Sequence, residues 1–122
     1  MSIEQNINES SFIHGWDRMS EQVHLTHLSK GWTKSSRPED PVWMGNQIAL
    51  MHGELSEAHE SIRKGTNDDK ITWRKGYEVE LADVIIRIMN FATEAKLDVA
   101  AALVEKARFN EGRPYLHGDK KF

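Results

Sequence analysis

The segment from Glu78 to Lys96, EVELADVIIRIMNFATEAK, most constrains what this chain can fold into. Its apolar residues recur at steps of three and four positions, which is typical of a helix with one broad buried face. They are Leu81, Val84, Ile85, Ile88, Phe91, Ala92 and Ala95, with Ile86 and Met89 on the flank. The pattern predicts a helix with little of its circumference facing water.

Polar side chains nevertheless follow one stripe of this helix. Steps of three and four residues return to the same helix face. Such steps lead from Glu80 to Asp83, Arg87 and Asn90, so these four residues share one face. Two carboxylates one turn apart on a largely buried helix need compensation, because an unpaired buried charge is very costly. We expect Arg87 to tether Asp83 and the acidic pair to share a cation.

A second predicted helix, from Met44 to Lys64, carries a matching acidic pair. Its apolar residues alternate steps of four and three, as in a helix packed in a bundle; they are Met44, Ile48, Met51, Leu55, Ala58 and Ile62. Glu54 and Glu57 lie one turn apart beside this stripe. If the two helices run antiparallel, four carboxylates can converge, from Glu54, Glu57, Glu80 and Asp83. Oxygen ligands suit hard cations, so we expect Mg²⁺, or Mn²⁺, as the cofactor.

Capping residues along the chain predict further helices and an all-α fold. We expect Ser20 to cap a first helix, Asp40 the second and Asp98 the last. Glycines follow the expected ends of these helices, at Gly31, Gly65 and Gly112. A chain of 122 residues fits one domain, and a second copy would help to bury its apolar helix faces. The prediction is a bundle of four to five helices completed by dimerisation.

Composition sets the expected boundaries and partners. The helical domain is predicted over residues 19–112, between an N-terminal arm at 1–18 and a basic tail at 113–122. The net charge of −3 argues against a nucleic-acid surface, and the lack of cysteine excludes disulfides and a thiolate metal site. No apolar run approaches the ~20 residues that span a bilayer, and the N-terminus lacks a signal-peptide pattern. We expect a cytoplasmic protein with neither nucleic-acid nor membrane partners.

Both acidic motifs resemble those of the MazG-like all-α nucleoside triphosphate pyrophosphohydrolases. That family carries Glu-Glu-x-x-Glu followed, after a spacer, by Glu-x-x-Asp. Here the first motif is GELSE at 53–57, with Gly53 in place of the leading Glu, and the second is ELAD at 80–83. KGW at 30–32 and KARFNEGRPYLHG at 106–118 also resemble elements of the short, single-domain branch.

The resemblance implies an Mg²⁺-dependent enzyme that hydrolyses a (deoxy)nucleoside triphosphate between the α and β phosphates. The products would be the monophosphate and pyrophosphate, a reaction suited to house-cleaning of the nucleotide pool. Family members are helical dimers, or tetramers made from dimers, with sites at subunit interfaces. The metal ligands would then be Glu54, Glu57, Glu80 and Asp83, and Glu54 would also orient the attacking water.

Basic and aromatic residues are expected to bind the triphosphate, because its hydrolysis needs positive charge. Lys106, the second predicted catalytic residue, and Asn110 lie one helical turn apart and would contact phosphate or sugar oxygens. The predicted substrate-binding set comprises Trp32, Lys106, Asn110, Arg113, His117 and Lys120. Trp32 would stack on the base. The alternatives are that the basic residues complement a helix macrodipole and that Trp32 packs in the core.

Two other classes of protein fit parts of the pattern. A ferritin-like di-iron protein needs Glu-x-x-His on each of two helices, and only Glu21 and His24 have that spacing. A non-catalytic helical dimer, acting as a regulatory or antitoxin-like module, would use its acids only to keep the surface soluble. Metal titration distinguishes this alternative from the enzyme, which should bind Mg²⁺ or Mn²⁺ and respond further to triphosphate.

Overall fold

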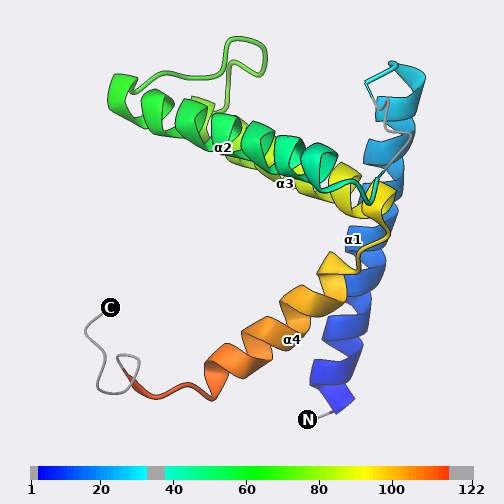
Figure 1. Ribbon diagram of the computed structural model, residues 1–122. Coiled ribbons are helices and arrows are strands. Elements are labelled where there is room, and N and C mark those ends of the chain that lie inside the picture. The colour runs from blue at the N-terminus through cyan, green and yellow to red at the C-terminus, as the bar shows by residue number, and fades with distance from the viewer. Residues whose placement is uncertain (1–2, 33–37, 116–122) are drawn as a thin grey trace. The chain divides into compact units, whose positions relative to one another are not determined.

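The computed structural model describes residues 3–32 and 38–115. Apart from one isolated bridge, the regular secondary structure of these residues is helical. The helices are α1 (Ile3–Ser29), α2 (Pro41–Lys64), α3 (Gly76–Ala95) and α4 (Val99–Glu111) (Figure 1). Over the described residues the only β-type pairing is an isolated bridge between Asn67 and Lys75. The all-α prediction is confirmed. Within the same part of the chain, none of the helices has the length and apolar character needed to cross a membrane.

The first helix begins much earlier than predicted. Ser20, the expected N-cap, lies in the interior of α1, where it is buried and its hydroxyl has no hydrogen-bond partner among the described residues. The prediction of a helix start at Ser20 was therefore wrong. Phe12 and Trp16, one turn apart with ring centroids at 6.0 Å, show that the helical spacing of apolar residues already exists upstream. A capping residue alone does not start a helix when the helical spacing of apolar residues continues on both sides of it.

The predicted ends of α2 are confirmed and have local causes. The Asp40 side chain accepts a hydrogen bond of 2.9 Å from the Val42 backbone N–H, and Pro41 occupies the first turn. At the other end Gly65 adopts φ +64°, a left-handed conformation that glycine takes at little cost, and its N–H donates to the Ser61 carbonyl.

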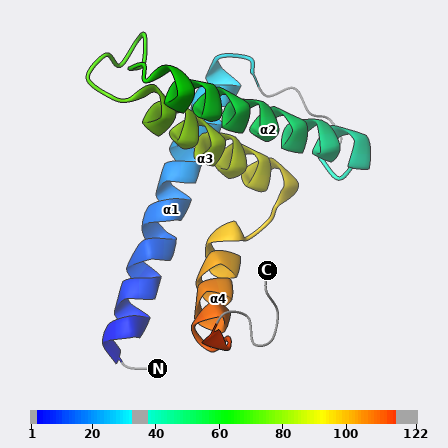
Figure 2. The same ribbon diagram turned by 90° about the vertical axis from the view of Figure 1, so that its left-hand side faces the viewer.

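Helices α2 and α3 form an antiparallel hairpin (Figures 1 and 2). At one end the Trp43 ring lies 5.6 Å from the Phe91 ring, centroid to centroid. At the other end Gly76 is buried against Ser61, so that an added Cβ would lie 2.3 Å from the Ser61 Oγ. The start of α2 thus faces the end of α3, which is the arrangement that the convergence of the acidic pairs requires.

The chain divides into two compact units. One unit contains Met1–Arg18 and Asp98–Phe122, where Arg108 of α4 forms an ion pair with Glu9 of α1. The other unit is Met19–Leu97, which contains the rest of α1 together with α2 and α3. Within this second unit His24 of α1 forms a hydrogen bond with Asn90 of α3, with 3.0 Å between Nδ1 and Oδ1. All the acidic residues of the candidate site belong to the second unit.

Candidate metal centre

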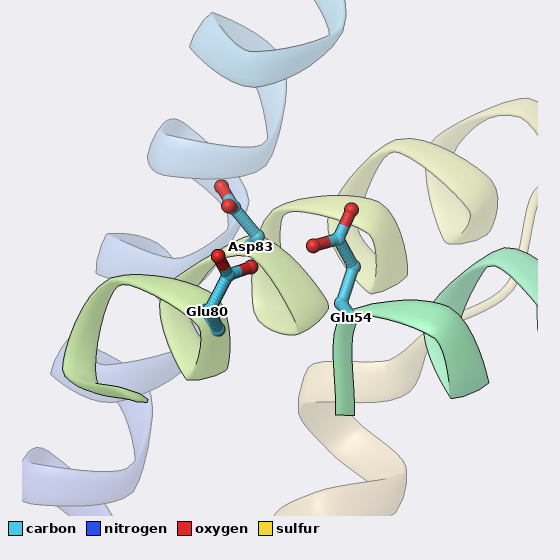
Figure 3. Close-up of side chains that lie close together, drawn as sticks. All are labelled: Glu54, Glu80 and Asp83. Carbon is cyan, nitrogen blue, oxygen red and sulfur yellow. The ribbon is translucent and has the colours of Figure 1, made fainter. Parts of the chain in front are cut away.

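Three carboxylates from two helices meet within the hairpin. Glu54 comes from α2, and Glu80 and Asp83 come from consecutive turns of α3. One oxygen of each lies within 4.8 Å of the others. Figure 3 shows the three side chains rising from their helices toward the same region. Spacing within α3 places two of the acids on one face, and the antiparallel packing of α2 adds the third.

Burial and mutual repulsion both favour the protonated acids. Burial is the largest cause that raises the pKa of the Glu80 carboxyl to about 7, followed by its hydrogen bond with Glu54 and the charges of Glu54, Asp83 and Glu57. Burial also raises the pKa of Asp83, with the Glu54 charge acting in the same direction. These carboxylates would be stabilised by added positive charge, whether a proton or a metal cation.

The positive charge within the cluster comes from Arg87, but its partner differs from the one predicted. Its Nε donates to Glu54 Oε1 at 3.0 Å and its Nη2 forms an ion pair with the same oxygen at 2.9 Å, linking α3 to α2. The expected tether to Asp83, four residues away on the same helix, is replaced by this contact between helices. The Arg87 charge still lowers the pKa of Asp83, against the effect of burial.

Glu57, the fourth predicted ligand, does not join the three acids. It is exposed and lines a small polar pocket of about 200 Å³ near the end of the hairpin, together with Glu80. Its charge nevertheless contributes to the raised pKa of Glu80. The structure therefore brings together three of the four carboxylates that were predicted to bind metal.

The three acids suit Mg²⁺ or Mn²⁺, which prefer oxygen ligands. Each acid is neither fully buried nor fully exposed, so water can reach the cluster. Mg²⁺ sites that act on phosphates use few carboxylates and leave positions for water and substrate. The donor set thus fits the predicted cofactor.

A pocket of about 610 Å³ opens beside the cluster, a volume ordinary for a small-molecule site. Glu54, Asp83 and Arg87 form its charged side, and it is also lined by His27 in the last turn of α1 and by Trp32 just after that helix. Trp32 is 66% exposed, and its ring meets the His27 ring edge-on with the centroids 5.4 Å apart. The predicted base-stacking residue therefore lies at the same pocket as the acids, and not in the core.

The remaining predicted substrate contacts belong to the other unit. Lys106 Nζ lies 4.8 Å from the centroid of the Phe109 ring, one turn along α4. Asn110 and Arg113 are exposed at the end of this helix, and the Arg113 N–H donates to the Asn110 carbonyl. His117 and Lys120 lie outside the described residues. The roles of these residues stay predictions.

Sequence reasoning missed the part of the pocket that α1 supplies. Val23 and His27, one turn apart, both line it; their spacing indicated a shared helix face but not that this face borders the acids. It also missed that Asn90, on the polar stripe of α3, is buried between helices and bonded to His24. The stripe on α3 therefore faces two helices and not only α2.

Comparison of the chain with protein-family models, with curated proteins and with solved structures gave no match. Fold and site together define the class as an all-α protein with a carboxylate cluster between two antiparallel helices.

Proposed function

We propose that this protein is a Mg²⁺-dependent nucleoside triphosphate pyrophosphohydrolase that resembles the MazG-like enzymes and accepts Mn²⁺ in place of Mg²⁺. The observation that carries the proposal is the cluster of Glu54, Glu80 and Asp83 at the edge of a pocket that also contains an exposed tryptophan. Polyphosphate chemistry needs concentrated positive charge, and a carboxylate cluster is how a protein holds a divalent cation. The neighbouring aromatic ring offers a surface for a nucleobase.

Each group in the pocket or beside it has a proposed task. Glu54, Glu80 and Asp83 would hold Mg²⁺, and Glu54 would also orient the attacking water. When bound, Mg²⁺ supplies charge neutralisation for the phosphates and lowers the pKa of coordinated water. Trp32 would stack on the base, with its edge contact to His27 keeping the ring in place. Glu57, exposed beside Glu80, remains a proposed ligand that would join only when a cation is present.

The basic residues near the C-terminus complete the proposal. Lys106 is the second proposed catalytic residue, and Asn110 and Arg113 are proposed to bind phosphate or sugar oxygens. The same role is proposed for His117 and Lys120. All three described members of this set are exposed and available for a ligand.

We further propose that the protein is a homodimer, or a tetramer made from dimers. Apolar residues remain exposed along one stripe of α2, at Ile48, Leu55 and Ile62, and on α3 at Leu81 and Ile85. Among the described residues no large side chain is fully buried, although many are apolar. A second copy would cover such faces, which soluble chains rarely leave open.

Pyrophosphate release from the common ribo- and deoxyribonucleoside triphosphates, measured with Mg²⁺, tests the activity. We expect Glu80→Gln and Asp83→Asn to lower turnover at least about 100-fold while circular dichroism shows an unchanged helical fold, because each loses a metal-binding charge. Glu60→Gln is the matched control: it removes the same charge from an exposed surface pair with Arg63 on α2.

Two results would contradict the proposal. One is undiminished turnover in folded Glu80→Gln and Asp83→Asn. The other is a wild-type protein that neither binds Mn²⁺ nor releases pyrophosphate from any triphosphate. This second result would favour the non-catalytic helical dimer.

A further inference from the structure

We infer that Arg87 is a counter-ion of the carboxylate cluster. Arg87 holds Glu54 while no cation is bound, and when a cation binds it releases Glu54 and contacts the polyphosphate instead. The second step rests on the proposed function, whereas the first concerns the cation-free protein alone. Arg87 would thus be a positioning residue in one state and a phosphate contact in the next.

The contacts of Arg87 show the first of these states. Its Nε donates a hydrogen bond of 3.0 Å to Oε1 of Glu54, and its Nη2 lies 2.9 Å from the same oxygen in an ion pair. The pair is partly buried, since the Glu54 side chain is 19% exposed and that of Arg87 is 35% exposed. Reduced access of water makes such a pair stronger than one on the open surface. It is also one of the contacts that hold Glu54 of α2 beside the acids of α3.

Charge balance shows why a counter-ion is needed there. When all three are ionised, the carboxylates, whose oxygens lie within 4.8 Å, repel one another, and the Arg87 guanidinium offsets part of that repulsion. Two negative charges then remain, which is the charge that one divalent cation neutralises. Without Arg87 the carboxylates would repel one another more strongly, whereas a second fixed cation would leave only one negative charge to attract a metal.

Displacement follows from competition for Glu54. A cation bound by Glu54 takes over the role of the guanidinium and repels it at short range. Arg87 also lines the pocket beside the cluster, so it can move toward a ligand there without crossing the protein interior. Nη1 has no hydrogen-bond partner among the described residues. A planar guanidinium matches the oxygens of a phosphate in a two-point contact, which lysine does not provide.

Binding of Mn²⁺ alone, and of inorganic tripolyphosphate in the presence of Mn²⁺, tests this inference without any turnover. Both affinities are measured by calorimetry for the wild type, Arg87→Gln and Arg87→Lys, together with the melting temperature in EDTA. Arg63→Gln serves as the matched control, because Arg63 forms an exposed pair with Glu60 at 2.9 Å on α2.

Arg87→Gln should melt at a lower temperature in EDTA, yet bind Mn²⁺ about 3- to 10-fold more tightly, because the competing charge is gone. Its affinity for tripolyphosphate should fall about 10-fold or more. Arg87→Lys keeps the charge, so its Mn²⁺ affinity should stay near the wild-type value while its tripolyphosphate affinity falls. Arg63→Gln should change neither affinity.

A purely structural role gives a different result: Arg87→Gln would melt earlier and bind Mn²⁺ no more tightly than the wild type, which would overturn the inference. Unchanged tripolyphosphate affinity in Arg87→Lys would do the same, even if Arg87→Gln failed to fold. If the wild type binds Mn²⁺ and hydrolyses triphosphate while these variants behave like it, only the role of Arg87 fails. If the wild type binds no Mn²⁺, this inference and the proposed function fail together.

Discussion

Glu80 illustrates how surroundings decide the chemistry of a single residue. Glu78, two positions earlier, is exposed and accepts a hydrogen bond from the Lys75 backbone N–H at the start of α3. Glu80 instead faces Glu54 across the hairpin, where burial and neighbouring acids raise its pKa to about 7. The same side chain therefore caps a helix at one position and titrates near neutral pH at the other.

The raised pKa of Glu80 predicts how the stability of the cation-free protein depends on pH. The native state holds the Glu80 proton more tightly than the unfolded chain does, because the pKa of this carboxyl is near 4.5 when the chain is unfolded. Stability should therefore be highest below about pH 4.5 as far as Glu80 is concerned, and should fall as the pH rises toward 7. Glu80→Gln should flatten this part of the curve, because it cannot ionise.

Denaturant unfolding in EDTA at pH 5, 6, 7 and 8 measures this dependence for the wild type and Glu80→Gln. The raised pKa of Asp83 acts in the same direction and remains in both proteins, so a smaller slope should persist in the variant. Equal slopes in the two proteins would show that Glu80 does not carry the effect.

At the scale of helices, two glycines of the hairpin have opposite roles. Gly76 begins α3 in close contact with the end of α2: an added Cβ would lie 2.3 Å from Ser61 Oγ and 3.1 Å from the Thr66 carbonyl oxygen. Gly53, in the middle of α2, has nothing within 4 Å of its Cβ position. One glycine therefore permits a close approach, whereas the other only weakens a helix.

The same substitution should consequently change stability in opposite directions at these sites. We expect Gly76→Ala to lower the free energy of unfolding by about 1–3 kcal/mol, because the added methyl group forces neighbours apart. Gly53→Ala should raise it by about 0.5–1 kcal/mol, because alanine is the better helix former. Denaturant unfolding of both variants measures the effect, and each is the control for the other. A gain from Gly76→Ala would mean that α2 and α3 do not meet so closely.

Helix ends show how much of each element could be read from the sequence. Asp40 and Asp98 cap α2 and α4 as predicted, because the contacts involved span only two or three residues. The capping prediction for Ser20 was wrong, because serine is also accepted inside a helix, and Ser20 is buried within α1. Whether such a residue is buried is not encoded in the local pattern.

For the whole molecule, the exposed apolar stripe on α2 predicts self-association. We expect the mass in solution to be at least twice the 14.0 kDa of one chain. Leu55→Lys should shift the protein toward the monomer, because Leu55 lies in the middle of the stripe and is 47% exposed in a single chain. Sedimentation equilibrium measures both masses.

Leu50→Lys provides the control for this experiment. Leu50 is as exposed as Leu55, but five residues along a helix place it on another face of α2. The variant should therefore keep the wild-type dimer. A monomeric wild type, or the same mass for Leu55→Lys and the wild type, would contradict the predicted interface.

The sequence by itself determined the helical class, the limits of α2 and the two acidic pairs, because each depends on residues no more than about four apart. Only the tertiary structure decided which acids meet, since that depends on how α2 and α3 turn about their axes when they pack. Packing brought Glu54 to Glu80 and Asp83, left Glu57 exposed, and gave Arg87 a partner on the other helix. The spacing of residues predicts which of them share a helix face. Which neighbouring helix packs against that face depends on contacts between residues some thirty positions apart.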